Sequence, residues 1–210
     1  MTERKTNLHR RRFLKTTIGA GALFAVPQVI PGAALGKDGA VPPADKIIVG
    51  GIGIGGRGGG DMGIMLSQPD VHVVATCDVR AERRKAVKGM IDRKYGDEKC
   101  VAYSDFRELL ARPDIDAVLI TTGPNWHGLA SIMAAKAGKD AYAEKPCTKT
   151  IAESLALADT FRRTARVFQG GMQRRSIPHF MFAIELANRG KLGKLREVHA
   201  HPAGMATGSS

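Results

Sequence analysis

Short apolar runs alternate with longer segments in which apolar residues recur every three or four positions, from about Lys46 to Ser176. Runs of the first kind are typical of buried strands, and the second spacing is typical of helices with one apolar face. The expected strands are 47–49, 71–77, 117–122, 141–143 and 167–169, and the helices between them centre on 62–66, 87–91, 129–133 and 151–158. This alternation predicts an α/β fold, a Rossmann-type doubly wound parallel sheet with helices on both faces.

One helix start is marked by side chains that can satisfy its free backbone amides. Thr150 is followed three residues later by Glu153, just before an apolar-periodic segment. In this capping-box spacing the two side chains each accept a hydrogen bond from a backbone N–H at the helix start. We therefore expect a helix to begin directly after Thr150.

A glycine-rich loop follows the first expected strand. Two registers satisfy the G-x-G-x-x-G spacing, one starting at Gly51 and the other at Gly53, and we favour the later one. Glycines at these positions let the backbone turn tightly and approach a pyrophosphate, whose charge then lies at a helix N-terminus. The residues predicted to bind the cofactor here are Gly53, Gly55, Gly56, Arg57 and Gly58.

An acidic residue at the end of the second strand completes this pattern. Asp78 lies twenty positions after Gly58, where a carboxylate accepts hydrogen bonds from an adenosine ribose. That carboxylate would repel a 2′-phosphate, so it favours NAD over NADP. Arg80, two residues later, could instead pair with such a phosphate and weakens the preference. NAD is the expected cofactor, and NADP stays open.

The first 36 residues have the composition of an export signal. Arg10 to Lys15 read Arg-Arg-Arg-Phe-Leu-Lys, and they precede an apolar run from Ile18 to Val26 and then a stretch rich in small residues and proline. The apolar run is too short to span a bilayer, and the arginine pattern is similar to bacterial twin-arginine signals, which a receptor reads. We expect export through the twin-arginine machinery to the periplasm or outside, with membrane contact only during export.

The charge and the cysteines exclude other classes. The net charge of +12 is partly due to this signal, since the first 36 residues hold six basic residues against one acidic residue. The remaining basic residues form no block interleaved with aromatics, so we expect no nucleic-acid partner. Cys77, Cys100 and Cys147 match neither a disulfide framework nor a zinc site, and we expect no metal.

Three later segments are similar in order and spacing to the Gfo/Idh/MocA oxidoreductases. They are 121–128 (TTGPNWHG), 138–146 (GKDAYAEKP) and 169–176 (QGGMQRRS), and the Glu-Lys-Pro of 144–146 is the most specific. The resemblance implies an N-terminal Rossmann domain, a C-terminal antiparallel sheet and a nicotinamide cofactor that exchanges hydride with a sugar or polyol. It leaves a homo-oligomer open.

The same resemblance assigns roles to individual residues. Lys145 matches the family's active-site lysine, and an ammonium at the end of a parallel strand can stabilise an alkoxide as hydride leaves. Glu144 would set the loop beside the cofactor, and Pro146, often cis in the family, would fix the chain direction. His127 would contact cofactor or substrate, or else cap the helix that begins there. Further cofactor contacts are expected from Thr122 and Asn125.

The predicted organisation is a signal at 1–36, a linker at 37–45, the Rossmann domain at 46–176, and at 177–210 only the start of an α+β substrate domain. The last segment would supply a helix and then a strand holding His199 and His201, neither of which matches the family's catalytic histidine. The acid/base residue would then lie outside this chain. Two alternatives to a dehydrogenase remain: a glycosidase that uses NAD transiently, and an inactive nucleotide-binding fragment.

Overall fold

The computed structural model describes residues 41–194 and 196–199. The chain divides into two compact units, 1–46 and 47–210. Of the first unit only the end is described, where Pro43–Asp45 forms a short 3-10 helix, η4, within the predicted linker. The predicted export signal lies outside the described residues.

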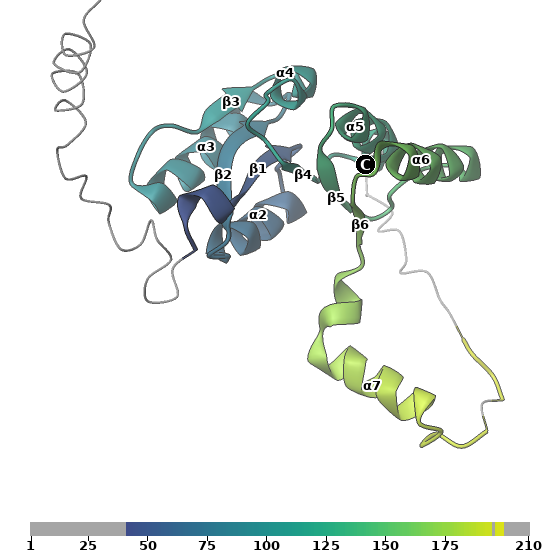
Figure 1. The fold of residues 1–210 in the computed structure, drawn as a ribbon. Helices are drawn as coiled ribbons and strands as arrows, with labels where there is room; N and C mark the ends of the chain where they lie inside the picture. Colours follow the sequence, from purple (N-terminus) through teal and green to yellow (C-terminus); the bar gives the residue numbers. More distant parts are fainter. Residues whose placement is uncertain (1–40, 195, 200–210) are drawn as a thin grey trace, which may run out of the picture. The chain divides into compact units, whose positions relative to one another are not determined.

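A six-stranded parallel sheet organises the second unit (Figure 1). The strand order is β3-β2-β1-β4-β5-β6. The strands are β1 Ile47–Ile52, β2 Val71–Cys77, β3 Val101–Tyr103, β4 Ala117–Ile120, β5 Asp140–Glu144 and β6 Phe168–Gly171. The helices are α2 Arg57–Ser67, α3 Ala81–Tyr95, α4 Phe106–Leu110, α5 Pro124–Lys136, α6 Ile151–Thr164 and α7 Pro178–Asn188, with a 3-10 turn η5 at Gln173–Ser176. The predicted Rossmann-type fold is confirmed.

Each face of the sheet is covered by its own hydrophobic core. On one face Val49, Val73 and Leu119 pack with residues of α2 and α3, including the fully buried Met62 and Ile91. On the other face the core combines strand residues with residues from α4, α5 and α6. Helices on both faces account for the nearly continuous apolar character of the central strands, because both faces of those strands are covered.

Two differences from the predicted elements concern short segments. Strand β3 and helix α4 were missed, because three and five residues are too few to establish a period. The strand expected near His199 is wrong for its described part, since Arg196–His199 adopt no regular secondary structure. A strand needs a hydrogen-bonding neighbour, and the described residues provide none for this segment. The preceding helix, α7, is present and exposes Phe182 and Ile184.

The capping box at the start of α6 is present with one change. The Thr150 hydroxyl accepts a hydrogen bond from the Glu153 N–H at 3.1 Å. The Glu153 carboxylate, however, accepts from the N–H of Lys149, at 2.8 Å, and not from that of Thr150. Both side chains still satisfy backbone donors at the helix start. They therefore fix where the loop after β5 ends and α6 begins.

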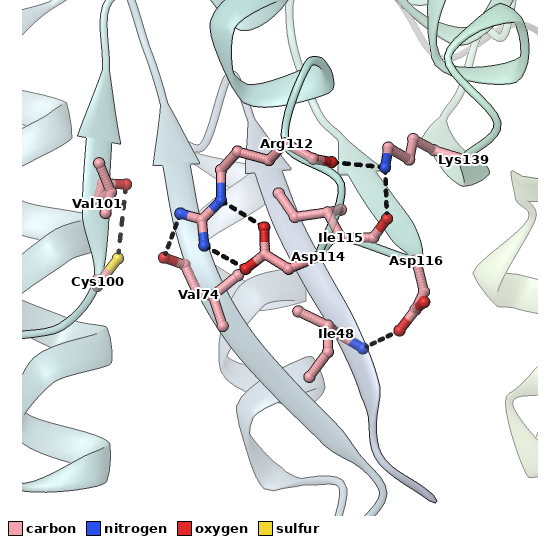
Figure 2. Close-up of polar contacts among 9 residues, drawn as sticks. All are labelled: Ile48, Val74, Cys100, Val101, Arg112, Asp114, Ile115, Asp116 and Lys139. Carbon is pink, nitrogen blue, oxygen red and sulfur yellow. Dashed lines mark hydrogen bonds and ion pairs between the residues drawn. The ribbon is translucent and has the colours of Figure 1, made fainter. Parts of the chain in front are cut away.

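Polar side chains tie the loops together at the amino edge of the sheet, meaning the end where the parallel strands begin (Figure 2). The buried Lys139 ammonium donates to the backbone carbonyls of Arg112 and Ile115, at 2.6 and 2.7 Å. The Asp116 carboxylate accepts the Ile48 N–H at 2.8 Å. These bonds fix the entry to β4 and β5 against β1.

Among the residues that the structure describes, no helix combines the length and apolar character needed to cross a membrane.

Candidate functional site

The strand order places one edge of the sheet in position to bind a ligand. Strands β1 and β4 are neighbours at the centre, and the chain moves outward from them in opposite directions, to β2 and β3 on one side and to β5 and β6 on the other. Ligands of open α/β sheets bind at the carboxyl ends of the strands at such a point. The predicted site residues Gly53, Asp78, Thr122 and Glu144 all follow or end strands at this carboxyl edge.

The geometry of the glycine loop fits the register that starts at Gly53. Gly53 has φ +74°, and a Cβ there would lie 2.6 Å from the Thr122 Cα. Gly56, with φ +50°, precedes the first residue of α2. A Cβ on Gly58 would overlap the Thr121 hydroxyl, whose own hydrogen bond goes to the Gly53 carbonyl at 3.0 Å. Gly51 lies inside β1, against Met62, so the earlier register would place its first glycine in a strand.

A cavity of about 220 Å³ opens beside this loop and Asp78. Asp78 is buried, and its Oδ1 accepts the Arg80 N–H at 2.8 Å. Thr122 lines the cavity together with Phe106 and Trp126, whose rings meet edge to face with centroids 6.4 Å apart. A largely apolar cavity with one buried carboxylate at its wall suits an adenosine, which presents a flat base and ribose hydroxyls.

Arg83, and not Arg80, is the arginine whose side chain lies beside the Asp78 carboxylate. The Arg80 side chain is exposed, and its backbone precedes α3. Arg83 lines the same cavity as Asp78, and its Nη1 lies 4.0 Å from Asp78 Oδ2. Its guanidinium also lies against Gly55, where an added Cβ would come within 2.6 Å of Nη1. Arg83 was missed in the sequence because its contact with Gly55 depends on how α3 packs beside the glycine loop, which is a tertiary feature.

A second cavity, of about 300 Å³, lies on the other side of the Thr121–Thr122 segment. It is lined by Arg57, Thr121, Thr122, Pro124, His127, Glu144, Lys145 and Gln173. Lys145 is exposed to it, and the Lys145 ammonium makes no hydrogen bond or ion pair with any described residue. The peptide bond from Lys145 to Pro146 is cis. A lysine ammonium at the mouth of a polar cavity can donate hydrogen bonds to a ligand hydroxyl.

His127 is buried in α5 and does not cap it. The helix begins after Gly123 with no side-chain capping bond, so the capping alternative is wrong. The His127 Nδ1 lies 2.7 Å from the Pro146 carbonyl, which can only accept, so Nδ1 carries the proton. In the neutral ring His127 Nε2 is then an acceptor, and this buried atom has no hydrogen-bond partner among the described residues. His127 thus supports the Lys145–Pro146 segment and leaves one unused acceptor at this site.

An acidic pair lies between the glycine loop and Lys145. Asp61 of α2 and Glu144 of β5 are both buried, and Arg57 lies 2.9 Å from Asp61 Oδ1 and 3.8 Å from Glu144 Oε1. Glu144 Oε2 accepts the backbone N–H of Lys145 at 3.1 Å. Burial raises the pKa of Asp61, Arg57 lowers it, and the Glu144 carboxyl raises it. Asp61 was not among the predicted residues, because a lone aspartate in a glycine-rich helix gives no signal of its own.

Asn125 and Gln173 differ in whether they line the two cavities. Asn125 is exposed in the first turn of α5 and lines neither cavity, where Pro124 and Trp126 stand instead. Gln173 of η5 does reach the second cavity.

Burial raises the pKa of Cys77 and of Cys100 to about 11, so both remain protonated thiols at neutral pH.

This fold and this edge define a dinucleotide-binding domain of the oxidoreductase type. The family model "Oxidoreductase family, NAD-binding Rossmann fold" of the Gfo/Idh/MocA proteins matches residues 47–172. The chain belongs to this family, and the matched region is its NAD-binding Rossmann domain.

Relatives and solved structures place the chain within that family. An alpha-N-acetylgalactosaminidase from Shewanella oneidensis is 33% identical over 175 residues, which cover 76% of this chain and 38% of that protein. A probable dehydrogenase from Thermotoga maritima superposes with a TM-score of 0.63 at 29% identity, over 70% of this chain and 43% of that one. Scyllo-inositol dehydrogenase from Lactobacillus casei, solved with NAD(H) and scyllo-inositol, gives 0.62 at 25% identity, over 70% and 42%. The chain thus spans about two fifths of the length of the curated relatives it matches.

Proposed function

We propose that the protein is a nicotinamide-dependent oxidoreductase that transfers hydride to or from a carbon of a sugar or polyol. The observation that carries this proposal is the pair of cavities at the carboxyl edge, which meet at Thr121 and Thr122. One has the carboxylate and apolar walls that suit an adenosine, and the other has the Lys145 ammonium. A dinucleotide extended along this edge would join the two.

The chain's own residues divide the work between holding the cofactor and polarising the substrate. Gly53, Gly55 and Gly58 would let the backbone approach a pyrophosphate at the N-terminus of α2, and the Asp78 carboxylate would accept hydrogen bonds from the ribose hydroxyls. When bound, NAD supplies the hydride acceptor. Lys145 would donate a hydrogen bond to the reacting oxygen and stabilise negative charge on it, while the Glu144 carboxylate holds the Lys145 backbone.

A second function is favoured by the relatives. The first matches in sequence are glycosyl hydrolase family 109 proteins, among them the Shewanella oneidensis galactosaminidase. A glycosidase that oxidises a sugar carbon only transiently would use the same site residues but would release sugar without net change in free NADH. A coupled assay of the whole protein with aryl glycosides and with free polyols separates the two, since only the dehydrogenase changes nicotinamide absorbance.

The cofactor assignment is tested by titrating the purified chain with NADH and NADPH and following nicotinamide fluorescence. We expect tighter binding of NADH than of NADPH, and a loss of about tenfold or more in NADH affinity in Asp78→Ala, because two ribose hydrogen bonds to a charged acceptor are removed. Arg80→Ala, whose side chain is exposed, should leave both affinities unchanged. A folded chain that binds neither nucleotide would overturn the proposal and leave an inactive fragment as the better account.

We propose further that the chain is exported through the twin-arginine machinery, on the support of the Arg10–Lys15 pattern and the apolar run that follows it. Such a route would carry the Rossmann domain already folded. Replacing both Arg10 and Arg11 by lysine should retain the protein in the cytoplasm of a bacterial host, whereas Arg4→Lys should not. Fractionation with immunoblotting measures this, and unchanged export of the double variant would contradict it.

A further inference from the structure

Two buried carboxyl groups meet between the cofactor loop and Lys145, although they come from elements far apart in the sequence. Asp61 lies in the second turn of α2, and Glu144 is the last residue of β5. Asp61 is 7% and Glu144 is 5% exposed. Two ionised carboxylates in such a place repel one another and lose their hydration, so they need either compensating charge or a proton.

The compensating charge is a single guanidinium that is itself half exposed. Arg57 contacts Asp61 Oδ1 at 2.9 Å and lies 3.8 Å from Glu144 Oε1, and 55% of its side chain is open to solvent. Tyr142 and Cys147, whose pKa values are raised by burial and by Glu144, are neutral at neutral pH. The Lys145 ammonium lines the same cavity as Arg57 and Glu144, but it forms no ion pair with either carboxylate among the described residues. One partly hydrated cation against two carboxylates leaves an excess negative charge in this cluster.

One oxygen of each carboxyl group lacks a hydrogen-bond donor, and a single proton would supply one. Asp61 Oδ2 and Glu144 Oε1 are both buried, and neither has a donor within hydrogen-bond reach among the described residues. The other oxygen of each group is used, by Arg57 in Asp61 and by the Lys145 N–H in Glu144. The Glu144 side chain lies close enough to Asp61 to raise its pKa through a hydrogen bond. A proton held between the two carboxyl groups makes one a donor and the other an acceptor, so it satisfies both.

We propose that Asp61 and Glu144 share one proton, and that this protonated pair, held by Arg57, is a positioning element that joins the cofactor loop to the backbone of Lys145. Asp61 is then a positioning residue of the site, acting through Arg57 and Glu144. Burial first and the Glu144 carboxyl also raise the pKa of Asp61, while Arg57 lowers it, and the net upward direction is the one that a shared proton requires. The link to the cofactor rests on the proposed function, since it presumes a pyrophosphate at the N-terminus of α2.

This arrangement makes dinucleotide binding depend on pH. Below the pKa of the pair the proton is bound, and the cluster carries no excess charge toward the anionic cofactor. As the pH rises through that pKa the proton leaves, and a second negative charge appears beside the glycine loop. Repulsion between that charge and a pyrophosphate within about a Debye length should weaken NADH binding roughly fivefold.

Two measurements on the full chain test this. Carbon-13 NMR of the carboxyl groups, without cofactor, should show one carboxyl that titrates well above the ordinary range in the wild type, and that resonance should be lost in Asp61→Asn. Fluorescence titration with NADH across pH 5 to 8 should show the affinity of the wild type falling with pH. Asp61→Asn should bind at every pH as the wild type does at low pH, because the amide keeps an acceptor for Arg57 and donates to Glu144. Asp159→Asn, on the exposed face of α6, is the matched control and should follow the wild type.

The outcomes separate the two proposals. If both carboxyls titrate in the ordinary range, the shared proton is wrong, whatever NADH does. If the raised titration is present but NADH affinity is independent of pH, the pair is structural and has no effect on the cofactor. If NADH does not bind at any pH, the proposed function fails, while the NMR titration still decides the state of the pair.

Discussion

The two edges of the sheet use polar side chains in opposite ways. At the amino edge, the Lys139 ammonium donates to two carbonyls of the loop before β4, and the Asp116 carboxylate accepts a backbone N–H of β1 (Figure 2). At the carboxyl edge, Asp61, His127 and Glu144 each keep a buried polar atom without a partner. Unpartnered buried groups cost stability unless a ligand, a water or a proton completes them. Two further unpartnered atoms among the described residues, on Thr76 and Ser131, lie inside β2 and α5. The amino edge is built for stability, and the carboxyl edge is left open for chemistry.

Two carboxyl groups, Asp114 and Asp61, show how the surroundings set the direction of a pKa shift. The Arg112 side chain is paired with Asp114 at the amino edge, and this hydrogen-bonded pair lowers the pKa of Asp114. At the carboxyl edge, burial dominates and raises the pKa of Asp61. Paired surface carboxylates stay charged at neutral pH, whereas a buried carboxyl with a second one beside it tends to keep its proton.

The largest expected effect is a loss of NADH affinity caused by a substitution at the carboxyl edge alone. Gly58→Ala adds a methyl group where the Thr121 hydroxyl stands, so α2 must move away from β4 and from the loop that follows it. We expect NADH affinity to fall by more than about tenfold, since a shift of that size misplaces several backbone donors. Fluorescence titration measures this, and circular dichroism establishes that the variant is folded. Wild-type affinity in a folded Gly58→Ala would show that the close contact is not needed for binding.

A smaller effect should come from the amino edge, and it should leave binding intact. Lys139→Met keeps the length of the side chain but leaves the carbonyls of Arg112 and Ile115 without their donor. We expect the free energy of unfolding to fall by about 2 kcal/mol, the cost of unsatisfied buried acceptors. Chemical denaturation measures the loss, with the exposed Lys136→Met as its control. A large loss of NADH affinity in folded Lys139→Met would contradict the separation of the two edges.

The smallest effect serves as the control for Gly58. Gly63 lies in the same helix, exposed, with no atom within 4 Å of an added Cβ. Gly63→Ala should therefore stabilise the protein by about 0.5 to 1 kcal/mol, because alanine is the better helix former. NADH affinity should not change. Thermal unfolding together with the same fluorescence titration checks both expectations.

Much of the fold could be predicted because it depends on short-range patterns. The apolar periodicity placed the central strands and the long helices, and Thr150 marked the start of α6. The glycine spacing and its separation from Asp78 are also local, since a strand, a turn and a helix follow one another without interruption. Strand β3 was missed because three residues carry too little periodicity, and its place is set by pairing with β2.

The chemistry of the carboxyl edge was decided by tertiary structure. The sequence alone determined that a dinucleotide loop, an acidic residue after β2 and a Glu-Lys-Pro segment exist in this order. Only the strand order brings α2 beside the end of β5, so that Asp61 meets Glu144, and only the packing of α5 turns His127 toward the Pro146 carbonyl. The direction in which α3 leaves β2 likewise brings the Arg83 side chain, and not that of Arg80, to the Asp78 carboxylate. Spacing along a chain fixes which residues share an element, whereas contacts between elements depend on how the whole sheet is wound.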